Sequence, residues 1–282
     1  MEAHRILIAA VAALALAGGV SAQGKAGSLI VKGSDTMVNL SASWAEAFMN
    51  EHPNVMVSVT GGGSGVGIAA LLGGTADICN ASRDIAAKEK KQAAENGVKP
   101  VETNVALDGI AVVVNPANPL AEISGDQLLH IYTGKVTNWK DINGQNEKIV
   151  VLSRETSSGT YVFFQEHVLQ KQDYTPSARL MPATSAIIEA VANDKASIGY
   201  VGLGYAEKAK DRVKLLAVKA TADAPAIVPS EEKVRSKEYW ISRPLHCYTN
   251  GEPKGDVKAF LEFCLSPAGQ AIVREQGYVP LN

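Results

Sequence analysis

Short apolar stretches alternate along the chain with stretches in which apolar residues recur at helical spacing. A β-branched stretch at 29–31 is followed by Met37, Leu40, Trp44 and Phe48, three or four residues apart. Further apolar stretches predict strands at 55–59, 76–78, 105–114, 149–152, 198–201, 213–218 and 244–249. Strands that alternate with helices predict an α/β fold with mainly parallel sheets.

Three of these predicted strands end in a Ser-, Thr- or Gly-rich turn that opens a helix. The turns cover residues 33–36, 61–65 and 154–160. The first N–H groups of a helix lack intrahelical partners, and the helix dipole favours negative charge there. One such turn indicates little, because Ser and Thr are also ordinary helix caps. Three turns, the last with Arg154 at its strand end, indicate convergence on one small oxyanion.

The chemistry of these turns suits a tetrahedral anion. Backbone N–H groups and hydroxyls donate hydrogen bonds without a counter-ion, and Arg154 adds a planar fork that fits two oxygens. Five of the seven residues in 61–67 are Gly, which permits a nest of N–H groups around Ser64. No Lys follows in the pattern of a nucleotide-binding loop, and the dinucleotide pattern fits only loosely.

The N-terminus has the pattern of a secretory signal peptide at residues 1–22. An uncharged apolar run at 6–17 precedes the small residues Val20, Ser21 and Ala22. The run is shorter than the ~18 apolar residues that a retained membrane anchor needs. The chain is therefore expected to be exported, and to be periplasmic after cleavage.

Charge and cysteine content narrow the classes of function. The chain has 27 basic and 29 acidic residues, a net charge of −2, which argues against a nucleic-acid or anionic membrane surface. Its three cysteines could form one disulfide, between Cys247 and Cys264, or remain three buried thiols. The five His residues show no metal-ligand spacing, so no metal, no cofactor and no enzymatic activity are expected. A secreted phosphatase with a Ser nucleophile is the alternative from the enzyme class.

At this point the motifs carry a resemblance. The segments concerned are 31–37, 61–68, 76–83, 107–116, 131–139 and 154–160. In this order, over nearly the whole mature chain, they resemble the periplasmic phosphate-binding proteins of bacterial ABC importers, in their shorter branch.

The resemblance implies a type II periplasmic-binding-protein fold, in which two lobes are joined by a two-strand hinge. One lobe would comprise residues 23–108 and 246–282, and the other residues 109–245. Closure of the lobes would surround a dehydrated phosphate and would be the signal that the membrane permease detects. The resemblance thus implies a monomer that delivers phosphate to an importer; another oxyanion, sulfate or molybdate, is the alternative ligand.

The resemblance also implies a set of site residues. They are Ser34, Thr36, Met37, Ser64, Arg83, Asp108, Arg154, Ser158, Gly159 and Thr160. Arg154 would grip two oxygens, while the others, apart from Asp108 and Arg83, would donate hydroxyls or N–H groups. Longer family members carry an Asp at the position of Arg83, and that Asp accepts the proton of hydrogen phosphate, which sulfate lacks. We expect Asp108 to be the replacement acceptor, with Arg83 as its partner or as a second cationic donor, and Asp35 as the second candidate.

Overall fold

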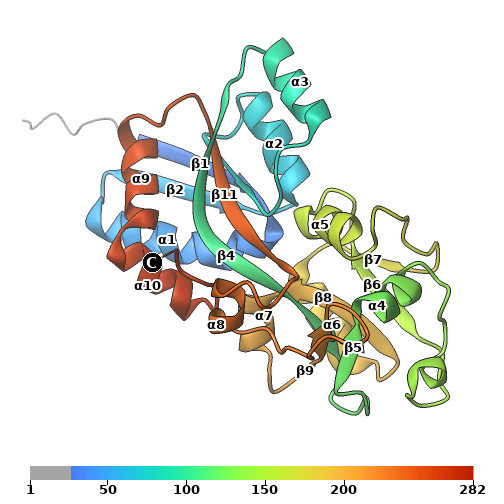
Figure 1. Ribbon diagram of the computed structural model, residues 1–282. Helices are drawn as coiled ribbons and strands as arrows, with labels where there is room; N and C mark the ends of the chain where they lie inside the picture. Colours follow the sequence, from blue (N-terminus) through green and yellow to red (C-terminus); the bar gives the residue numbers. More distant parts are fainter. Residues whose placement is uncertain (1–26, 282) are drawn as a thin grey trace, which may run out of the picture.

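The computed structural model describes residues 27–281, so the expected signal peptide lies outside the described residues. Strands and helices alternate, as the apolar pattern predicts (Figure 1). The strands are β1 (Gly27–Gly33), β2 (Val55–Thr60), β3 (Ile78–Ala81), β4 (Pro100–Val114), β5 (Glu122–Ser124), β6 (Val150–Arg154), β7 (Arg179–Met181), β8 (Ser197–Gly202), β9 (Lys214–Leu215), β10 (Ala217–Lys219) and β11 (Ser242–Asn250). The helices are α1 (Val38–Glu51), α2 (Ser64–Leu72), α3 (Ala87–Glu95), α4 (Gly125–Tyr132), α5 (Gly159–His167), α6 (Thr184–Asn193), α7 (Leu203–Lys208), α8 (Glu231–Arg235), α9 (Gly255–Leu265) and α10 (Pro267–Glu275), with 3-10 turns η1 (Asp35–Met37) and η2 (Trp139–Ile142).

Two long strands, β4 and β11, connect the two ends of the molecule (Figure 1). The main sheet has the order β2-β1-β3-β11-β4-β8-β6-β7, with β9 also paired to β4. Neighbours are parallel among β1, β2 and β3 and among β6, β7 and β8. Every pair that includes β4 or β11 is antiparallel. The expected parallel pairing therefore holds within each end, and the crossing strands make the sheet mixed.

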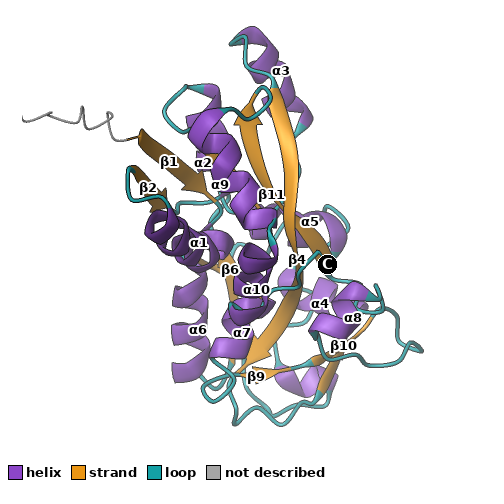
Figure 2. Cartoon of the chain, turned by 90° about the vertical axis from the view of Figure 1, so that its left-hand side faces the viewer, coloured by secondary structure: helices purple, strands orange, loops and turns teal. Residues whose placement is uncertain are grey.

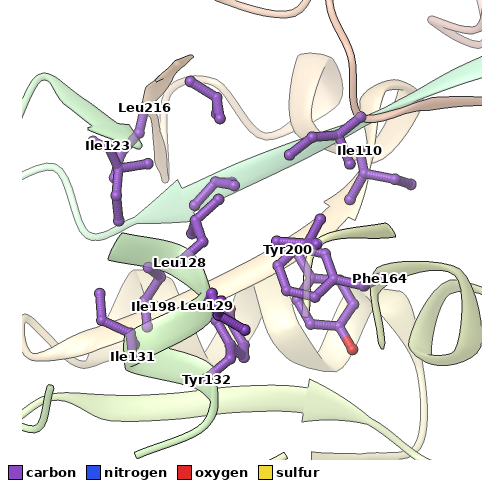
Figure 3. Close-up of a cluster of buried hydrophobic side chains, with 14 of the residues drawn as sticks. Ile110, Ile123, Leu128, Leu129, Ile131, Tyr132, Phe164, Ile198, Tyr200 and Leu216 are labelled. Atoms are coloured by element: carbon purple, nitrogen blue, oxygen red, sulfur yellow. The ribbon is translucent and has the colours of Figure 1, made fainter. Parts of the chain in front are cut away.

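Buried side chains form separate cores at the two ends of these crossing strands. On β4 the first core ends at Ala106, and the second begins at Ile110. On β11 and the segment before it, the second core ends at Ile241 and the first resumes at Leu245. Figure 3 shows part of the second core, where the rings of Phe164 and Tyr200 stack with centroids 4.1 Å apart. The strands between the cores carry the side chains of the site described below.

The C-terminal segment also reaches both cores. Tyr278 packs in the first core and Val279 in the second. The N–H of Leu107 donates to the Val279 carbonyl at 2.8 Å, and the N–H of Val279 donates back at 3.0 Å. Helix α10 precedes this segment, and its Gln270 donates from Nε2 to the Val105 carbonyl of β4 at 3.0 Å (Figure 2). A third segment therefore bridges the two ends beside β4 and β11.

Two further observations concern the cysteines and the helices of the described residues. Cys79, Cys247 and Cys264 are buried free thiols, so the disulfide alternative is wrong in this structure. Between residues 27 and 281, each helix is too short or too polar to cross a bilayer.

Candidate functional site

Three buried hydroxyls from one end of the molecule meet where strands give way to helices. Ser34 follows β1, Ser64 opens α2 and Ser82 follows β3. The Ser34 hydroxyl donates to Ser82 Oγ at 2.8 Å, and the backbone N–H of Ser82 donates to Ser64 Oγ at 3.0 Å. Parallel strands β1 and β3 are neighbours, so their carboxyl ends, and the turns that follow, lie together.

The start of α5 packs onto these hydroxyls from the other end of the molecule. Ser158 caps α5, since its Oγ accepts from the N–H groups of Thr160 and Tyr161. Gly159 lies so close that a Cβ there would overlap the Ser64 hydroxyl and stand 2.6 Å from Ser82 Oγ. The three Ser-, Thr- and Gly-rich turns therefore meet at one place.

Two threonine hydroxyls continue the cluster. Thr36 Oγ1 and Thr160 Oγ1 hydrogen-bond at 2.9 Å, although they belong to opposite ends of the molecule. Both side chains are buried. With the three serines, they make a cluster of five hydroxyls, each with one hydrogen to donate. In this structure the Ser34 hydrogen is directed to Ser82 Oγ and one threonine hydrogen to the other threonine, so an anion would have to redirect these bonds to itself. We call Ser34, Thr36, Ser64, Ser82 and Thr160 the hydroxyl cluster.

An ion pair from the crossing strands completes this site. Arg243 of β11 donates from Nη2 to Asp108 Oδ2 at 3.1 Å and to Thr160 Oγ1 at 2.9 Å. Its Nη1 donates to the Ser82 carbonyl at 2.6 Å, and its guanidinium lies over the Phe163 ring, 5.2 Å from the centroid. The N–H of Leu203 donates to Asp108 Oδ1 at 3.0 Å. A fixed positive fork and one carboxylate thus adjoin the hydroxyl cluster.

The electrostatics of this pair follow from its burial. Asp108 has no exposed surface and Arg243 is 4% exposed. Burial raises the pKa of Asp108, and the Arg243 guanidinium and the Leu203 N–H oppose that rise. Among the described residues, Nε of Arg243 is buried without a hydrogen-bond partner, an arrangement that costs about 1–3 kcal/mol when a donor stays unpaired. An oxyanion would supply the acceptor.

Arg154 lies at the end of β6, as expected, but its donors have other partners. Its Nε donates to the Met181 carbonyl, its Nη1 to Thr184 Oγ1 at 2.7 Å, and its Nη2 to the Pro182 carbonyl. Nη2 is also 3.2 Å from Asp35 Oδ2, an ion pair between opposite ends of the molecule. In this structure Arg154 links the two ends, and Arg243 is the arginine in contact with the hydroxyl cluster.

The structure bears on three further residues that were expected in the site. Arg83 was expected either as the partner of Asp108 or as a second cationic donor. The first alternative is wrong, because Asp108 pairs with Arg243, while both terminal nitrogens of Arg83 donate to Glu89. The second alternative stays a prediction; the Nε of Arg83 is buried without a hydrogen-bond partner among the described residues. The Met37 N–H, expected to donate to the ligand, donates to the Ser34 carbonyl within the η1 turn at 3.0 Å. Asp35, the second candidate acceptor, is committed to Arg154 and to the Thr184 N–H at 2.7 Å.

Sequence reasoning missed Arg243 and Ser82. Arg243 sits directly before the predicted strand at 244–249, and a charged residue at the start of an apolar strand was the available signal. Ser82 lies in the segment 76–83 that carried the resemblance, but was not chosen. Its contacts depend on the pairing of β3 with β1, which the sequence does not display.

The sequence of the chain is similar to that of known phosphate-binding proteins. Residues 19–268 match the PBP superfamily domain. The phosphate-binding protein PstS of Staphylococcus epidermidis is 34% identical over 90% of this chain and 78% of its own length. PstS of Staphylococcus aureus is 33% identical over 88% of this chain and 76% of its own length.

Solved structures agree with the sequence relatives. A Clostridium perfringens protein, assigned to a phosphate ABC transporter as its substrate-binding protein and solved with bound phosphate, has a TM-score of 0.82 and 31% identity. The alignment covers 91% of this chain and all of that one. An ABC-type phosphate transport receptor from Vibrio cholerae has a TM-score of 0.71 and 29% identity, over 89% of this chain and 99% of its own.

Proposed function

The chain belongs to the PBP superfamily and, within it, to the PstS phosphate-binding proteins, and we propose that it binds one inorganic phosphate at the hydroxyl cluster. It is a binding protein and not an enzyme. Phosphate is held by the five hydroxyls, by the N-terminal end of α5, where the helix dipole favours an anion, and by Arg243. Arg243 carries the proposal, because its Nη2 donates to Thr160 of the hydroxyl cluster while its buried Nε has no hydrogen-bond partner among the described residues.

The arrangement of donors and of one acceptor in the site would favour phosphate over sulfate. The hydroxyls, N–H groups and guanidinium offer donors, and Asp108 is the one carboxylate in contact with Arg243. A carboxylate has about four acceptor sites, and the Leu203 and Arg243 bonds use two of them. Asp108 can therefore accept the proton of hydrogen phosphate, whereas sulfate at neutral pH brings no proton.

Delivery would depend on movement of two lobes about β4 and β11. We assign residues 27–108 and 246–281 to one lobe and residues 109–245 to the other, because the buried cores separate near these positions. The site is built from both lobes, so phosphate would favour the closed form and a permease would detect it. The protein acts outside the cytoplasm; we propose a periplasmic monomer that serves a phosphate ABC importer.

The first test of this function concerns the choice between anions. Titration calorimetry of the purified protein at neutral pH should give one-to-one binding of phosphate and at least about a hundredfold weaker binding of sulfate, a difference of about 3 kcal/mol. Replacement of Asp108 by Asn removes the ionised acceptor and should reduce that preference at least about tenfold. The ratio is the informative quantity, because the lost negative charge should help both anions.

Comparable sulfate binding by the unaltered protein would contradict the acceptor role and favour a less selective oxyanion carrier. Glu102→Gln offers a matched control, since Glu102 is a carboxylate of the same strand that lies outside the hydroxyl cluster. Turnover of a phosphate ester by the purified protein would instead revive the phosphatase alternative.

A second test concerns the Arg154–Asp35 ion pair. Arg154→Ala and Asp35→Asn should each weaken phosphate binding about tenfold, roughly 1.4 kcal/mol, because each removes a bond that holds the lobes together. Calorimetry on the double variant should show little further loss, since the two residues act as one pair.

A different result is expected if Arg154 binds phosphate directly. Arg154→Ala would then be much more damaging than Asp35→Asn, and the two losses would add. Lys91→Ala serves as a control for loss of one positive charge, because Lys91 is a surface residue of α3 paired only weakly with Glu95 at 4.0 Å.

A further inference from the structure

A histidine and two carboxylates meet on the crossing strands, outside the hydroxyl cluster. His246 of β11 lies opposite Ala81 of β3 and Asn104 of β4, where the register of the β11–β4 pair shifts. Asp84 follows β3, and Glu102 lies on β4. Because β11 is hydrogen-bonded to both strands, the three side chains converge, and their ligand atoms all lie within 4.8 Å of one another.

The hydrogen bonds around His246 define its tautomer. Nδ1 lies 2.7 Å from Asn104 Oδ1, and an amide oxygen only accepts, so Nδ1 carries the hydrogen. In the neutral ring Nε2 then presents a lone pair, and it lies 3.3 Å from Asp84 Oδ1, which also only accepts. Two acceptors at this distance repel each other unless a cation lies between them. A metal ion and a proton are the two cations that could lie there, and the experiment below separates them.

We propose that Asp84, Glu102 and His246 form a binding site for one divalent transition-metal ion, Zn²⁺ being the best match. Tetrahedral zinc, with bonds to N and O of about 2.1 Å, sets neighbouring ligand atoms about 3.3–3.4 Å apart. The distance from His246 Nε2 to Asp84 Oδ1 is 3.3 Å. Glu102 Oε1 lies 3.3 Å from the other ring nitrogen, and Glu102 belongs to the group whose ligand atoms lie within 4.8 Å of one another. Glu102 supplies the third ligand once its carboxylate turns toward the ion. Imidazole together with carboxylates suits zinc better than magnesium or calcium.

The surroundings of these ligands support the assignment. Metal-binding histidines usually donate their second ring N–H to a carbonyl or carboxylate, which fixes the ring, and Asn104 accepts that bond here. The Tyr248 hydroxyl likewise donates to Glu102 Oε2 at 2.7 Å. Asp84 and His246 line a groove of about 430 Å³ that Arg243 also borders. The ion could therefore enter from solvent and keep a water as its fourth ligand.

Calorimetric titration of the tag-free protein with ZnCl₂ in phosphate-free buffer tests the site. We expect one ion per chain, and roughly tenfold or greater loss of affinity in both Asp84→Asn and His246→Gln. Asp84 is an exposed side chain, so its variant keeps the test valid should His246→Gln fail to fold. His167→Gln is the matched control, because His167 lines the same groove without belonging to the cluster.

Three results would overturn the site: no stoichiometric zinc binding, zinc binding unchanged in Asp84→Asn, or equal loss in His167→Gln. An NMR titration that finds His246 charged at neutral pH, with no zinc bound, would identify a proton as the cation instead. Phosphate binding is measured in a separate titration without zinc. Its absence from the unaltered protein would refute the proposed function and leave the zinc result interpretable.

Discussion

Replacement of Arg243 by Gln should weaken phosphate binding at least about a hundredfold, roughly 3 kcal/mol. Arg243 contacts Thr160 of the hydroxyl cluster through Nη2, and its Nε is a buried donor without a partner among the described residues. Gln keeps much of the packing against Phe163 but removes the positive charge and the planar fork. Isothermal titration calorimetry measures the loss directly.

This substitution also affects folding, and the experiment must separate the two effects. Without Arg243, Asp108 is left as a buried unpaired charge, which costs roughly 3–5 kcal/mol. In the double variant, Asp108→Asn with Arg243→Gln, thermal stability should recover while phosphate affinity stays low. Arg212→Gln is the control, because Arg212 pairs with Glu189 on the surface. Affinity that changed less than about threefold in Arg243→Gln would contradict the assignment of Arg243 to the site.

The second large effect is expected from Gly159→Ala. The added methyl group would overlap the Ser64 hydroxyl and stand 2.6 Å from Ser82 Oγ, both on the opposite lobe. Gly159 is the first residue of α5 and has no positive φ, so Ala suits its own helix. The clash therefore arises only when the lobes close. Phosphate affinity should fall at least about a hundredfold, while the phosphate-free protein melts at the same temperature or higher.

Two measurements distinguish this mechanism from general damage. Small-angle X-ray scattering should show compaction on phosphate addition in the unaltered protein and none in Gly159→Ala. Thr156→Ala, an exposed position in the same turn, should bind phosphate normally. Should Gly159→Ala bind phosphate normally, α5 would not need to approach Ser64 so closely.

The order of elements could be predicted because it depends on local patterns. The strand expected at 55–59 is β2, and the one expected at 105–114 is the inner part of β4. The outer part of β4, from Pro100, was missed because exposed Glu and Asn alternate there with half-buried residues. The apolar stretch that the pattern reveals begins only at Val105 and is interrupted at Asp108 and Gly109, between the two cores. The α/β fold and its family were thus predictable and are confirmed by the comparisons.

The site was predictable only where one short segment supplies its groups. Ser34, Ser64 and Thr160 belong to turns whose composition is visible in the chain. The partners of the two arginines are not visible, because they come from distant segments that only the sheet order brings together. Arg154 was predicted to grip phosphate, which stays a prediction; the sequence could not show that Asp35 and residues 181–184 accept from its donors. Arg243 lies outside the three Ser-, Thr- or Gly-rich turns, so the composition of those turns could not indicate it.

The backbone pairing of Leu107 with Val279 has a mechanical consequence. Two adjacent strands that connect two lobes, such as β4 and β11, allow the lobes both to bend and to twist relative to each other. No contact away from the strands themselves would resist the twist. The C-terminal segment attaches beside these strands, with Tyr278 also donating from its hydroxyl to the Thr36 carbonyl. Such a third attachment restrains torsion more than bending. We therefore expect opening of the proposed lobes to be biased toward a single direction, so that the same donors would meet again on each closure.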